Sequence, residues 1–264
     1  MINGVNVMKR KYLSYYTFTI LVFFSTLLIA AHVYSAGDGI RLGQTRVIFN
    51  AENNNAKAVI KNSSQQVYLI KSEVMNTPDG NDPKLTKPPF IVTPPMFRLE
   101  KESTGTALIV RNGTSKLPTD RESVFYLSLL AIPSVSKAGI SGENMTNAQV
   151  SVGIRNVIKL FYRPEGLKPA FSEAAEKLVF RQNGNLVQVS NPTPYYLTLA
   201  ALSFDQKPVN VRDMNPMIAP FSANTYPVAG AVSEVQWSVI TDFGDISQAF
   251  KAVVTAGVFT NGTQ

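Results

Sequence analysis

The stretch that decides the fold is VSVGIRNVIKLFYRPEG, residues 150–166. Its apolar residues Val150, Val152 and Ile154 alternate with small or polar residues, which is typical of a β-strand with one apolar face. The strand pattern continues to Tyr162 and is then broken by an Arg-Pro-Glu-Gly sequence, a signal for the end of an element. The stretch therefore predicts the last strand of one β-domain and the beginning of a second domain.

Shorter runs of β-branched and aromatic residues precede this stretch, with Gly, Pro, Asn and Asp between them. Seven short strands with such spacing are typical of an antiparallel immunoglobulin-like β-sandwich. The strands expected in this first domain are Ile40–Phe49, Ala56–Asn62, Val67–Met75, Phe90–Leu99, Thr106–Arg111, Val124–Ile132 and Val150–Tyr162.

A second set of alternating runs follows the boundary, and it predicts a second β-domain. We expect one helical turn at Ser172–Lys177 and place Trp237, the only tryptophan, in the core of this domain. The predicted domains are residues 36–163 and 164–264. The expected strands of the second are Lys177–Gln182, Leu186–Ser190, Tyr195–Phe204, Thr225–Val228, Val235–Thr241 and Ala249–Ala256.

Residues 1–35 have the features of a secretory signal peptide. Basic residues 9–11 precede an apolar run, Thr17–Ala31, and small residues follow it. Cleavage after Ser35 and cleavage after Ala36 both fit. The alternative is a membrane anchor, but the run is shorter than the about 20 apolar residues that a span needs. We therefore expect an exported chain that does not insert into a membrane once the signal is removed.

The residue types that are missing limit the chemistry of the mature chain. There is no Cys, and the only His, His32, lies within the predicted signal peptide. Thiol and imidazole mechanisms, and zinc or copper sites with their usual ligands, are therefore excluded. We expect no catalytic residues, no metal and no cofactor. Carboxylate-only or Lys-based catalysis stays open on composition, but no spacing of acidic residues indicates it.

The charge of the mature chain is small. The whole sequence has a net charge of +7, and removal of residues 1–35 leaves 22 basic and 18 acidic residues. No consecutive Lys or Arg residues remain in that part. A nucleic-acid-binding function is therefore not indicated.

Six strings of residues carry a resemblance to a known family. They are TRVIF (45–49), FIVTPP (90–95), LPTDRESVFY (117–126), IKLFYRP (158–164), NPTPYY (191–196) and ITDFG (240–244). In order and spacing they resemble motifs of the periplasmic pilus assembly chaperones of the chaperone–usher pathway. The resemblance covers nearly all of the mature chain and implies two immunoglobulin-like domains in an L or boomerang arrangement. Without Cys and with only a moderate loop at 133–147, the chain looks like the short-loop branch.

The resemblance implies a non-enzymatic periplasmic chaperone that binds, folds and caps pilus subunits, both pilins and the tip adhesin. In this family the seventh strand completes the subunit by donor-strand complementation, and an outer-membrane usher receives the subunit. The resemblance also implies a self-capping dimer when no subunit is present. The residues offered to the subunit would be Val150, Val152 and Ile154, here called the donor row. By alternation alone this row would be ordinary core.

The resemblance assigns Arg46 and Lys159 to the binding of the subunit's C-terminal carboxylate, with Thr45 orienting Lys159. Taken alone, each cation would be a surface charge. Strict alternation places Lys159 on the opposite face from the donor row. A bulge near Gly153 or Asn156, or a turn of the strand at the domain corner, would reconcile the two.

A third group, Glu122, Arg163 and Asp242, comes from three distant parts of the sequence. The resemblance implies that these residues form an ion network between the domains, which sets the angle between them. Each alone would be a surface charge of little energetic value.

Two other classes of function fit the sequence less well. An exported structural or adhesive β-sandwich protein of a surface fibre would be an incomplete pilin with a donor arm and usually a disulfide, whereas this chain has two full sets of strands. A carboxylate-dependent hydrolase would need a pocket with paired acidic residues, and the sequence indicates none.

Overall fold

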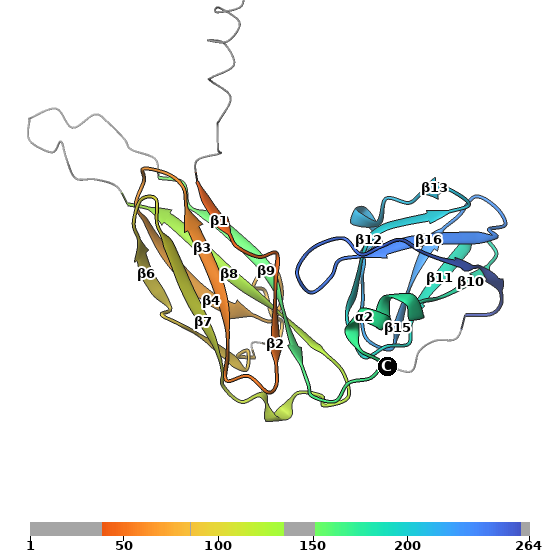
Figure 1. Ribbon diagram of the computed structural model, residues 1–264, viewed down its shortest axis with the longest axis horizontal. Helices are drawn as coiled ribbons and strands as arrows, with labels where there is room; N and C mark the ends of the chain where they lie inside the picture. Colours follow the sequence, from red (N-terminus) through yellow and green to blue (C-terminus); the bar gives the residue numbers. More distant parts are fainter. Residues whose placement is uncertain (1–38, 85, 135–150, 260–264) are drawn as a thin grey trace, which may run out of the picture. The chain divides into compact units, whose positions relative to one another are not determined.

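The structure is a computed structural model that describes residues 39–84, 86–134 and 151–259. Nearly all regular structure in these ranges is β-strand, and the strands form four sheets (Figure 1). No helix within these ranges is long and apolar enough to cross a membrane. The predicted signal peptide and Val150 lie outside the described residues.

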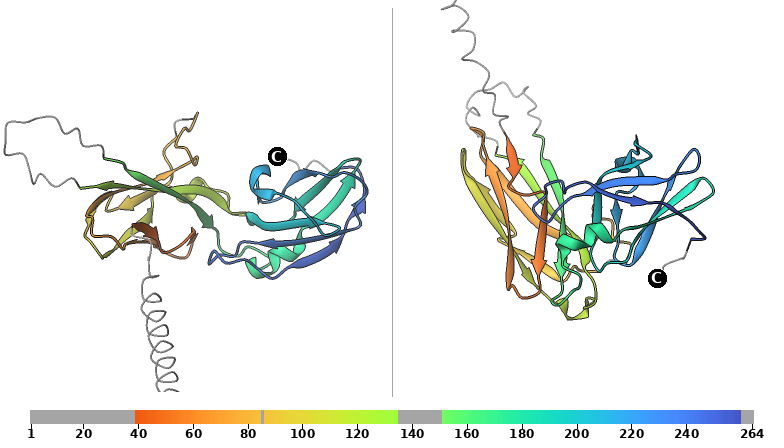
Figure 2. Two further views of the ribbon diagram at one scale, coloured as in Figure 1. Left: turned by 90° about the horizontal axis from the view of Figure 1, so that it is seen from above. Right: turned by 45° about the vertical axis from the view of Figure 1, so that its right-hand side comes forward.

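Two sheets make up the first sandwich (Figures 1 and 2). One has the order β1-β3-β7-β5 and the other β2-β9-β8-β4-β6, and a 3-10 turn at Thr114–Lys116 precedes β8. The strands are β1 (Ile40–Leu42), β2 (Arg46–Asn50), β3 (Asn55–Asn62), β4 (Tyr68–Met75), β5 (Phe90–Thr93), β6 (Met96–Leu99), β7 (Thr104–Arg111), β8 (Ser123–Pro133) and β9 (Ile154–Arg163).

The other two sheets make up the second sandwich, with orders β15-β11-β10-β18 and β13-β12-β16-β17, and with β14 paired to β12. Its strands are β10 (Val179–Asn183), β11 (Leu186–Asn191), β12 (Leu197–Phe204), β13 (Lys207–Pro208), β14 (Met217–Ile218), β15 (Ser222–Pro227), β16 (Glu234–Val239), β17 (Phe250–Val253) and β18 (Thr255–Ala256). Helix α2 (Phe171–Ala174) runs into a 3-10 turn at Ala175–Lys177, and another 3-10 turn spans Val211–Met214. The prediction of two β-sandwiches is confirmed.

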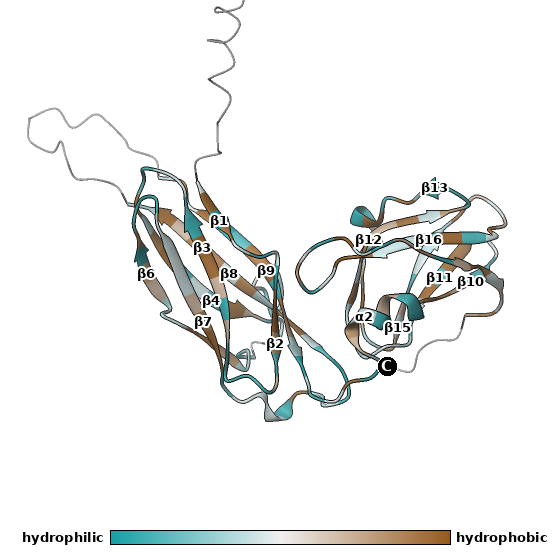
Figure 3. Cartoon of the chain, in the orientation of Figure 1, coloured by the Kyte–Doolittle hydropathy of each residue, from teal (hydrophilic) through white to brown (hydrophobic). Residues whose placement is uncertain are grey.

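Each sandwich encloses its own apolar core. Figure 3 colours the strands by hydropathy, with apolar (brown) and polar (teal) stretches in both sandwiches. In β3, Ala58 and Ile60 are fully buried, whereas Lys57 and Lys61 are exposed. In the second core Trp237 is only 2% exposed and its Nε1 donates to the carbonyl of Ala175 at 3.0 Å. The prediction that Trp237 is a core residue is therefore confirmed.

The predicted strand Ile40–Phe49 is two strands in two sheets, so this prediction was wrong. β1 pairs antiparallel with β3, whereas β2 pairs parallel with β9. The chain changes sheets between Leu42 and Arg46, where the N–H of Gly43 still donates to Val59 at 2.8 Å. Alternation continues through the crossing, so the sequence pattern does not reveal it.

The predicted strand Phe90–Leu99 is divided in the same way. β5 pairs with β7 in one sheet, and β6 pairs with β4 in the other. The Thr93–Pro94 peptide bond, between the two strands, is cis. The two prolines at 94 and 95 carry no N–H, which interrupts the ladder at the point where the chain changes sheets.

Strand β9 has no bulge in its pairing with β8. The register runs unbroken from Ile154 opposite Ala131 to Tyr162 opposite Ser123. Of the alternatives offered to reconcile the donor row with Lys159, a bulge near Asn156 is therefore excluded, and Gly153 precedes the strand. Because alternation is strict, Ile154 and Lys159 lie on opposite faces of β9.

Candidate functional site

Strand β9 has one fully paired edge and one partly free edge. β8 pairs with it from Ile154 to Tyr162, but β2 pairs only from Lys159 to Arg163. Residues 154–158 therefore face no strand on the second edge within the described ranges. The sheet change between β1 and β2 creates this gap, because β1 pairs with β3 in place of β9. The result is an edge with unpaired backbone groups next to the start of β2.

Of the donor row, Ile154 lies at this free edge and Val152 precedes it by two residues. Val152 is 70% exposed and Ile154 is 50% exposed, whereas Ile158 packs against the core of the first sandwich. Ile154 and Ile158 lie on the face of β9 that, further along, carries the buried residues Leu160 and Tyr162. Along this face of β9, the side chains thus change from buried at Leu160 and Tyr162 to exposed at Ile154.

Arg46 and Lys159 are direct neighbours across the β2–β9 pair and therefore share one face of the sheet. Arg46 is only 7% exposed, its guanidinium lies 5.7 Å above the ring of Phe161, and its Nη1 donates to the carbonyl of Ile240 at 3.3 Å. Its buried Nε has no hydrogen-bond partner. No carboxylate pairs with Lys159 in the part of the chain that the structure describes. The structure thus brings the two predicted cations together.

The two cations destabilise one another in the absence of an anion. Burial lowers the pKa of Lys159, and the neighbouring Arg46 charge lowers it further. Burial also lowers the pKa of Arg46, although the charges of Asp242 and Glu122 oppose this effect. By contrast Arg155, on the same face of β9, lies 3.7 Å from Glu73. A bound carboxylate would supply the negative charge that Arg46 and Lys159 lack.

Thr45, predicted to orient Lys159, is exposed at the residue before β2. No hydrogen bond joins Thr45 to Lys159 within the described ranges. Its Oγ1 instead lies against Gly244, so closely that a Cβ on Gly244 would clash with it. The orienting role of Thr45 stays a prediction.

Glu122, Arg163 and Asp242 form one connected ion network. Arg163 Nε donates to Glu122 Oε1 at 2.7 Å, and its Nη1 and Nη2 donate to the two Asp242 oxygens at 2.7 and 2.8 Å. The second Glu122 oxygen accepts the backbone N–H of Tyr196 at 2.8 Å. The Arg163 guanidinium also lies 4.7 Å from the ring of Phe171. Arg163 therefore has partners from both sandwiches, Glu122 beside β8 and Asp242 and Phe171 in the second domain.

This network is compensated. Burial raises the pKa of Glu122, and the charge of Arg163 with the Tyr196 N–H opposes this. Burial alone would lower the pKa of Arg163, but the hydrogen bonds and charges of Asp242 and Glu122 outweigh it, so the pKa is raised. With side chains 1% and 15% exposed, Glu122 and Arg163 depend on one another for charge compensation.

Sequence reasoning missed the backbone groups that bind the charged side chains of this region. The carbonyl of Ile240 binds Arg46, and the N–H of Tyr196 binds Glu122. Both belong to strings that carried the family resemblance, ITDFG and NPTPYY. Backbone groups have no residue-specific signal, so only the position of these strings could have indicated them.

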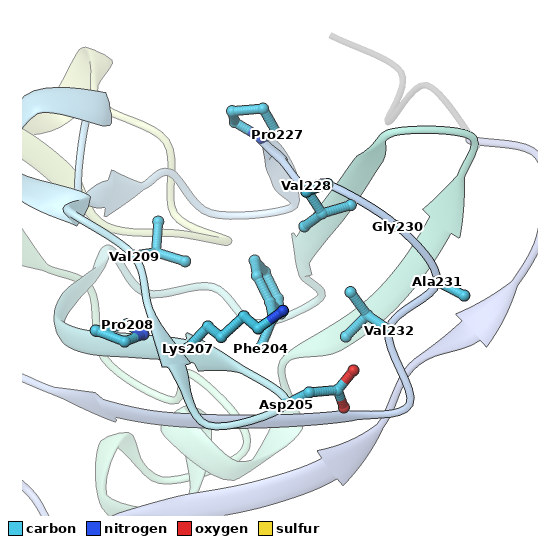
Figure 4. A pocket seen from close by; sticks show the side chains of 11 residues that line it. Phe204, Asp205, Lys207, Pro208, Val209, Pro227, Val228, Gly230, Ala231 and Val232 are labelled. Carbon is cyan, nitrogen blue, oxygen red and sulfur yellow. The ribbon is translucent and has the colours of Figure 1, made fainter.

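Two cavities of the second sandwich, among the residues that the structure describes, contain no pair of free carboxylates that could share a proton. A cavity of about 260 Å³, shown in Figure 4, has Asp205 as its only acidic residue, and that carboxylate accepts the backbone N–H groups of Ser233 and Glu234. A second cavity of about 370 Å³ is bordered by Asp242 and Asp245, but both oxygens of Asp242 are bound by Arg163. Neither cavity includes a residue of the predicted donor row or cation pair.

The sequence and the fold match known proteins over most of the chain. Residues 39–168 match the family described as pili and flagellar-assembly chaperone, PapD N-terminal domain, and residues 173–251 match the pili assembly chaperone PapD, C-terminal domain. The chaperone protein HifB of Haemophilus influenzae is 36% identical over 228 residues, which cover 85% of this chain and 92% of HifB. The chaperone protein FimC of Escherichia coli K12 is 32% identical over 253 residues, 95% of this chain and 98% of FimC.

Solved structures agree with these relatives. The SafB chaperone of Salmonella enterica, solved in complex with the SafA pilin, has a TM-score of 0.68 at 31% identity and covers 82% of this chain and 96% of its own. The E. coli chaperone DraB has a TM-score of 0.67 at 32% identity and covers 81% of this chain and 98% of its own. The chain therefore belongs to the family of pilus assembly chaperones of the chaperone–usher pathway and acts as a chaperone in pilus assembly.

Proposed function

We propose that the chain acts in the periplasm, without enzymatic activity, by adding the free edge of β9 to an incomplete pilus subunit as a donor strand. The observation that carries this proposal is the coincidence of an open edge on β9, exposed apolar side chains at its start, and a pair of neighbouring cations, Arg46 on β2 and Lys159 on β9, that share no hydrogen-bonded carboxylate in the described ranges. Exposed strand edges with apolar side chains promote aggregation, and proteins normally protect them with charged residues, prolines, bulges or a covering element. Such an edge is expected where another strand is meant to pair.

The direction of the added strand follows from β2. A strand on the free edge at 154–158 would lie in line with β2, which begins at Arg46 and runs parallel to β9. If the added strand also runs parallel to β9, its C-terminal carboxylate reaches the row of Arg46 and Lys159. There the carboxylate can accept charge-assisted hydrogen bonds from both cations. The anchor therefore requires parallel pairing and fixes its register.

The two faces of β9 then have different tasks. Val152 and Ile154, and by extension Val150, enter the subunit core on one face, while Lys159 holds the chain end from the other. Each apolar side chain that is fully buried contributes about 1.5–3 kcal/mol, and each backbone hydrogen bond about 0.5–1.5 kcal/mol net. The donor row supplies most of the affinity and the anchor supplies the register.

The complex of the similar chaperone SafB with the SafA pilin supports pilins as the partner class. We extend this to the tip adhesin and to delivery of the subunit to an outer-membrane usher, in which a subunit strand replaces β9. The Glu122–Arg163–Asp242 network, in this proposal, fixes the relative orientation of the two domains. Charge pairs that bridge domains limit the hinging that is otherwise expected.

The test is capture of subunits from periplasm. We expect that Arg46→Ala and Lys159→Ala each prevent co-purification of pilin, while the control Lys57→Ala, an exposed cation on β3, leaves it unchanged. Circular dichroism should show that all three variants are folded. Normal amounts of pilin with Arg46→Ala and Lys159→Ala would contradict the anchor.

A binding experiment with peptides distinguishes recognition of the terminal carboxylate by Arg46 and Lys159 from general charge attraction. A synthetic peptide that copies the last strand of the captured pilin should bind with a free C-terminus and bind much more weakly with an amidated one. Equal binding of both forms would show that the cations do not recognise the terminal carboxylate.

A further inference from the structure

The loop between β16 and β17, residues 240–249, is fixed to the first sandwich at three points. The carbonyl of Ile240 accepts from Arg46 at 3.3 Å, and Asp242 pairs with Arg163 through two hydrogen bonds. Gly244 lies against Thr45 and has φ of +91°, a conformation that favours glycine. Thr45 directly precedes Arg46, so this loop is held next to the cation pair.

Phe243 stands between two of these contacts and is exposed. It is 88% exposed, the largest value among the large apolar side chains of the described ranges. Another exposed phenylalanine, Phe221, has the guanidinium of Arg121 at 4.9 Å from its ring, whereas no ring contact of Phe243 is found in those ranges. An isolated surface phenylalanine would need no explanation. This one is presented by a backbone that Asp242 and Gly244 fix on either side.

The position of Phe243 matches the end of the strand that we expect β9 to receive. That strand would end beside Arg46, at the place where Thr45 and Gly244 meet. Side chains of the added strand alternate between the two faces, so every second one points to the face that carries Lys159. On that face the tethered loop is bound to Arg46 itself.

We propose that Phe243 is a subunit-binding residue, which packs against an apolar side chain near the C-terminus of the bound pilus subunit. This inference rests on the proposed function. The second domain thereby takes part in recognition, and its contact selects subunits that have an apolar residue at this position. Three tethers hold the loop before binding, so little conformational entropy is lost when the contact forms.

The experiment measures binding of a fluorescent peptide that copies the last strand of the captured pilin, with a free carboxylate. Phe243→Ala should weaken binding roughly 10-fold, as expected for an aromatic interface residue, and Phe243→Leu should retain most of it. Val253→Ala is the matched control, because Val253 is 74% exposed on β17 of the same domain. Since the Phe243 side chain is exposed, the melting temperature of Phe243→Ala should equal that of the parent.

A second peptide gives the selective readout. It carries Ala in place of the terminal apolar residue on the Lys159 face, and with this peptide Phe243→Ala should have no further effect. Equal weakening by Phe243→Ala with both peptides, or an equal loss with Val253→Ala, would overturn the inference.

The proposed function can be judged separately with Arg46→Ala. If Arg46→Ala abolishes peptide binding and Phe243→Ala leaves it unchanged, strand donation stands and the role of Phe243 is wrong. If neither variant changes binding, the anchor itself is wrong and the inference about Phe243 falls with it.

Discussion

The charged groups at the two ends of the β2–β9 pair differ in whether a carboxylate binds them. At one end Arg46 lies beside Lys159, and at the other Asn50 lies beside Arg163. Arg163 is bound by two carboxylates, whereas Arg46 and Lys159 have none as hydrogen-bonded partners within the described ranges. Along one pair of strands the protein thus has a completed ion network and an incomplete one. The comparison indicates that Glu122, Arg163 and Asp242 stabilise the protein's own structure, whereas Arg46 and Lys159 are available to bind a ligand.

The physical difference is in the cost of burial. Removing a charge from water costs several kcal/mol unless a partner compensates it. Glu122, Arg163 and Asp242 compensate one another. Lys159 is disfavoured both by burial and by the charge of Arg46, and the charges of Asp242 and Glu122 only oppose the effect of burial on Arg46. Perturbed charges of the second kind are typical of functional sites.

Breaking the completed network should have the largest effect. Arg163→Ala leaves Glu122 buried without a cation, and we expect it to lower the free energy of unfolding by about 3–5 kcal/mol. Urea unfolding followed by far-UV circular dichroism measures this loss. The double variant Glu122→Gln with Arg163→Met should be less destabilised than Arg163→Ala, because the most deeply buried charge, that of Glu122, is removed and Asp242 is 25% exposed. A fully stable Arg163→Ala protein would show that the network carries no stability.

Introducing a charge into the donor row should come next. Val152→Asp should weaken pilin binding about a hundredfold, because an apolar contact is lost and a carboxylate enters an apolar groove. Ile91→Asp is the control, since Ile91 is 52% exposed on β5 of the opposite sheet. Both variants should unfold like the parent. Retained affinity of Val152→Asp would argue against strand donation.

A milder substitution tests the contribution of Asp242, the more exposed carboxylate of the network. Asp242→Asn keeps the shape but removes a charge from a side chain that is 25% exposed, so we expect a loss of only about 1 kcal/mol in unfolding free energy. The loss should shrink in high salt, because the pair is partly accessible to water. A loss as large as that of Arg163→Ala would mean that Asp242, not Glu122, is the main partner.

Removing a charge from the incomplete pair should cost the free protein nothing. Lys159→Met should leave the stability unchanged or raise it by less than about 1 kcal/mol, although pilin binding is lost. The folded pKa of Lys159 lies below its unfolded value, so the penalty is complete at neutral pH and is relieved as pH rises between the two. The stability advantage of Lys159→Met over the parent should therefore decrease as the pH rises through that alkaline range. A clear loss of stability at neutral pH would show that Lys159 is structural.

The sequence predicted these regions unequally. Alternation and turn residues predicted two β-sandwiches and the core position of Trp237, because burial of one face imposes period 2. They did not predict that Ile40–Phe49 and Phe90–Leu99 each divide between two sheets, since alternation is unaffected by the partner strand. The first of these crossings is what frees the edge of β9 at 154–158.

The charged groups were predictable only through family resemblance. Arg46 and Lys159 are 113 positions apart, and no spacing rule indicates that they are neighbours in parallel strands. The bulge, one of the alternatives offered to reconcile the donor row with Lys159, is not found in the pairing of β9 with β8 from Ile154 to Tyr162. An added strand meets both faces of β9, so alternation without a bulge is compatible with both tasks.

The most direct test of strand donation is amide hydrogen exchange of β9 with and without the bound pilin. Alternate amide groups at residues 154–158 should become protected in the complex, while β7 in the other sheet should keep its exchange rates. The same protection should be absent with Arg46→Ala. If pilin binds and the amides at 154–158 exchange as in the free protein, the edge of β9 is not the binding site and the account is wrong.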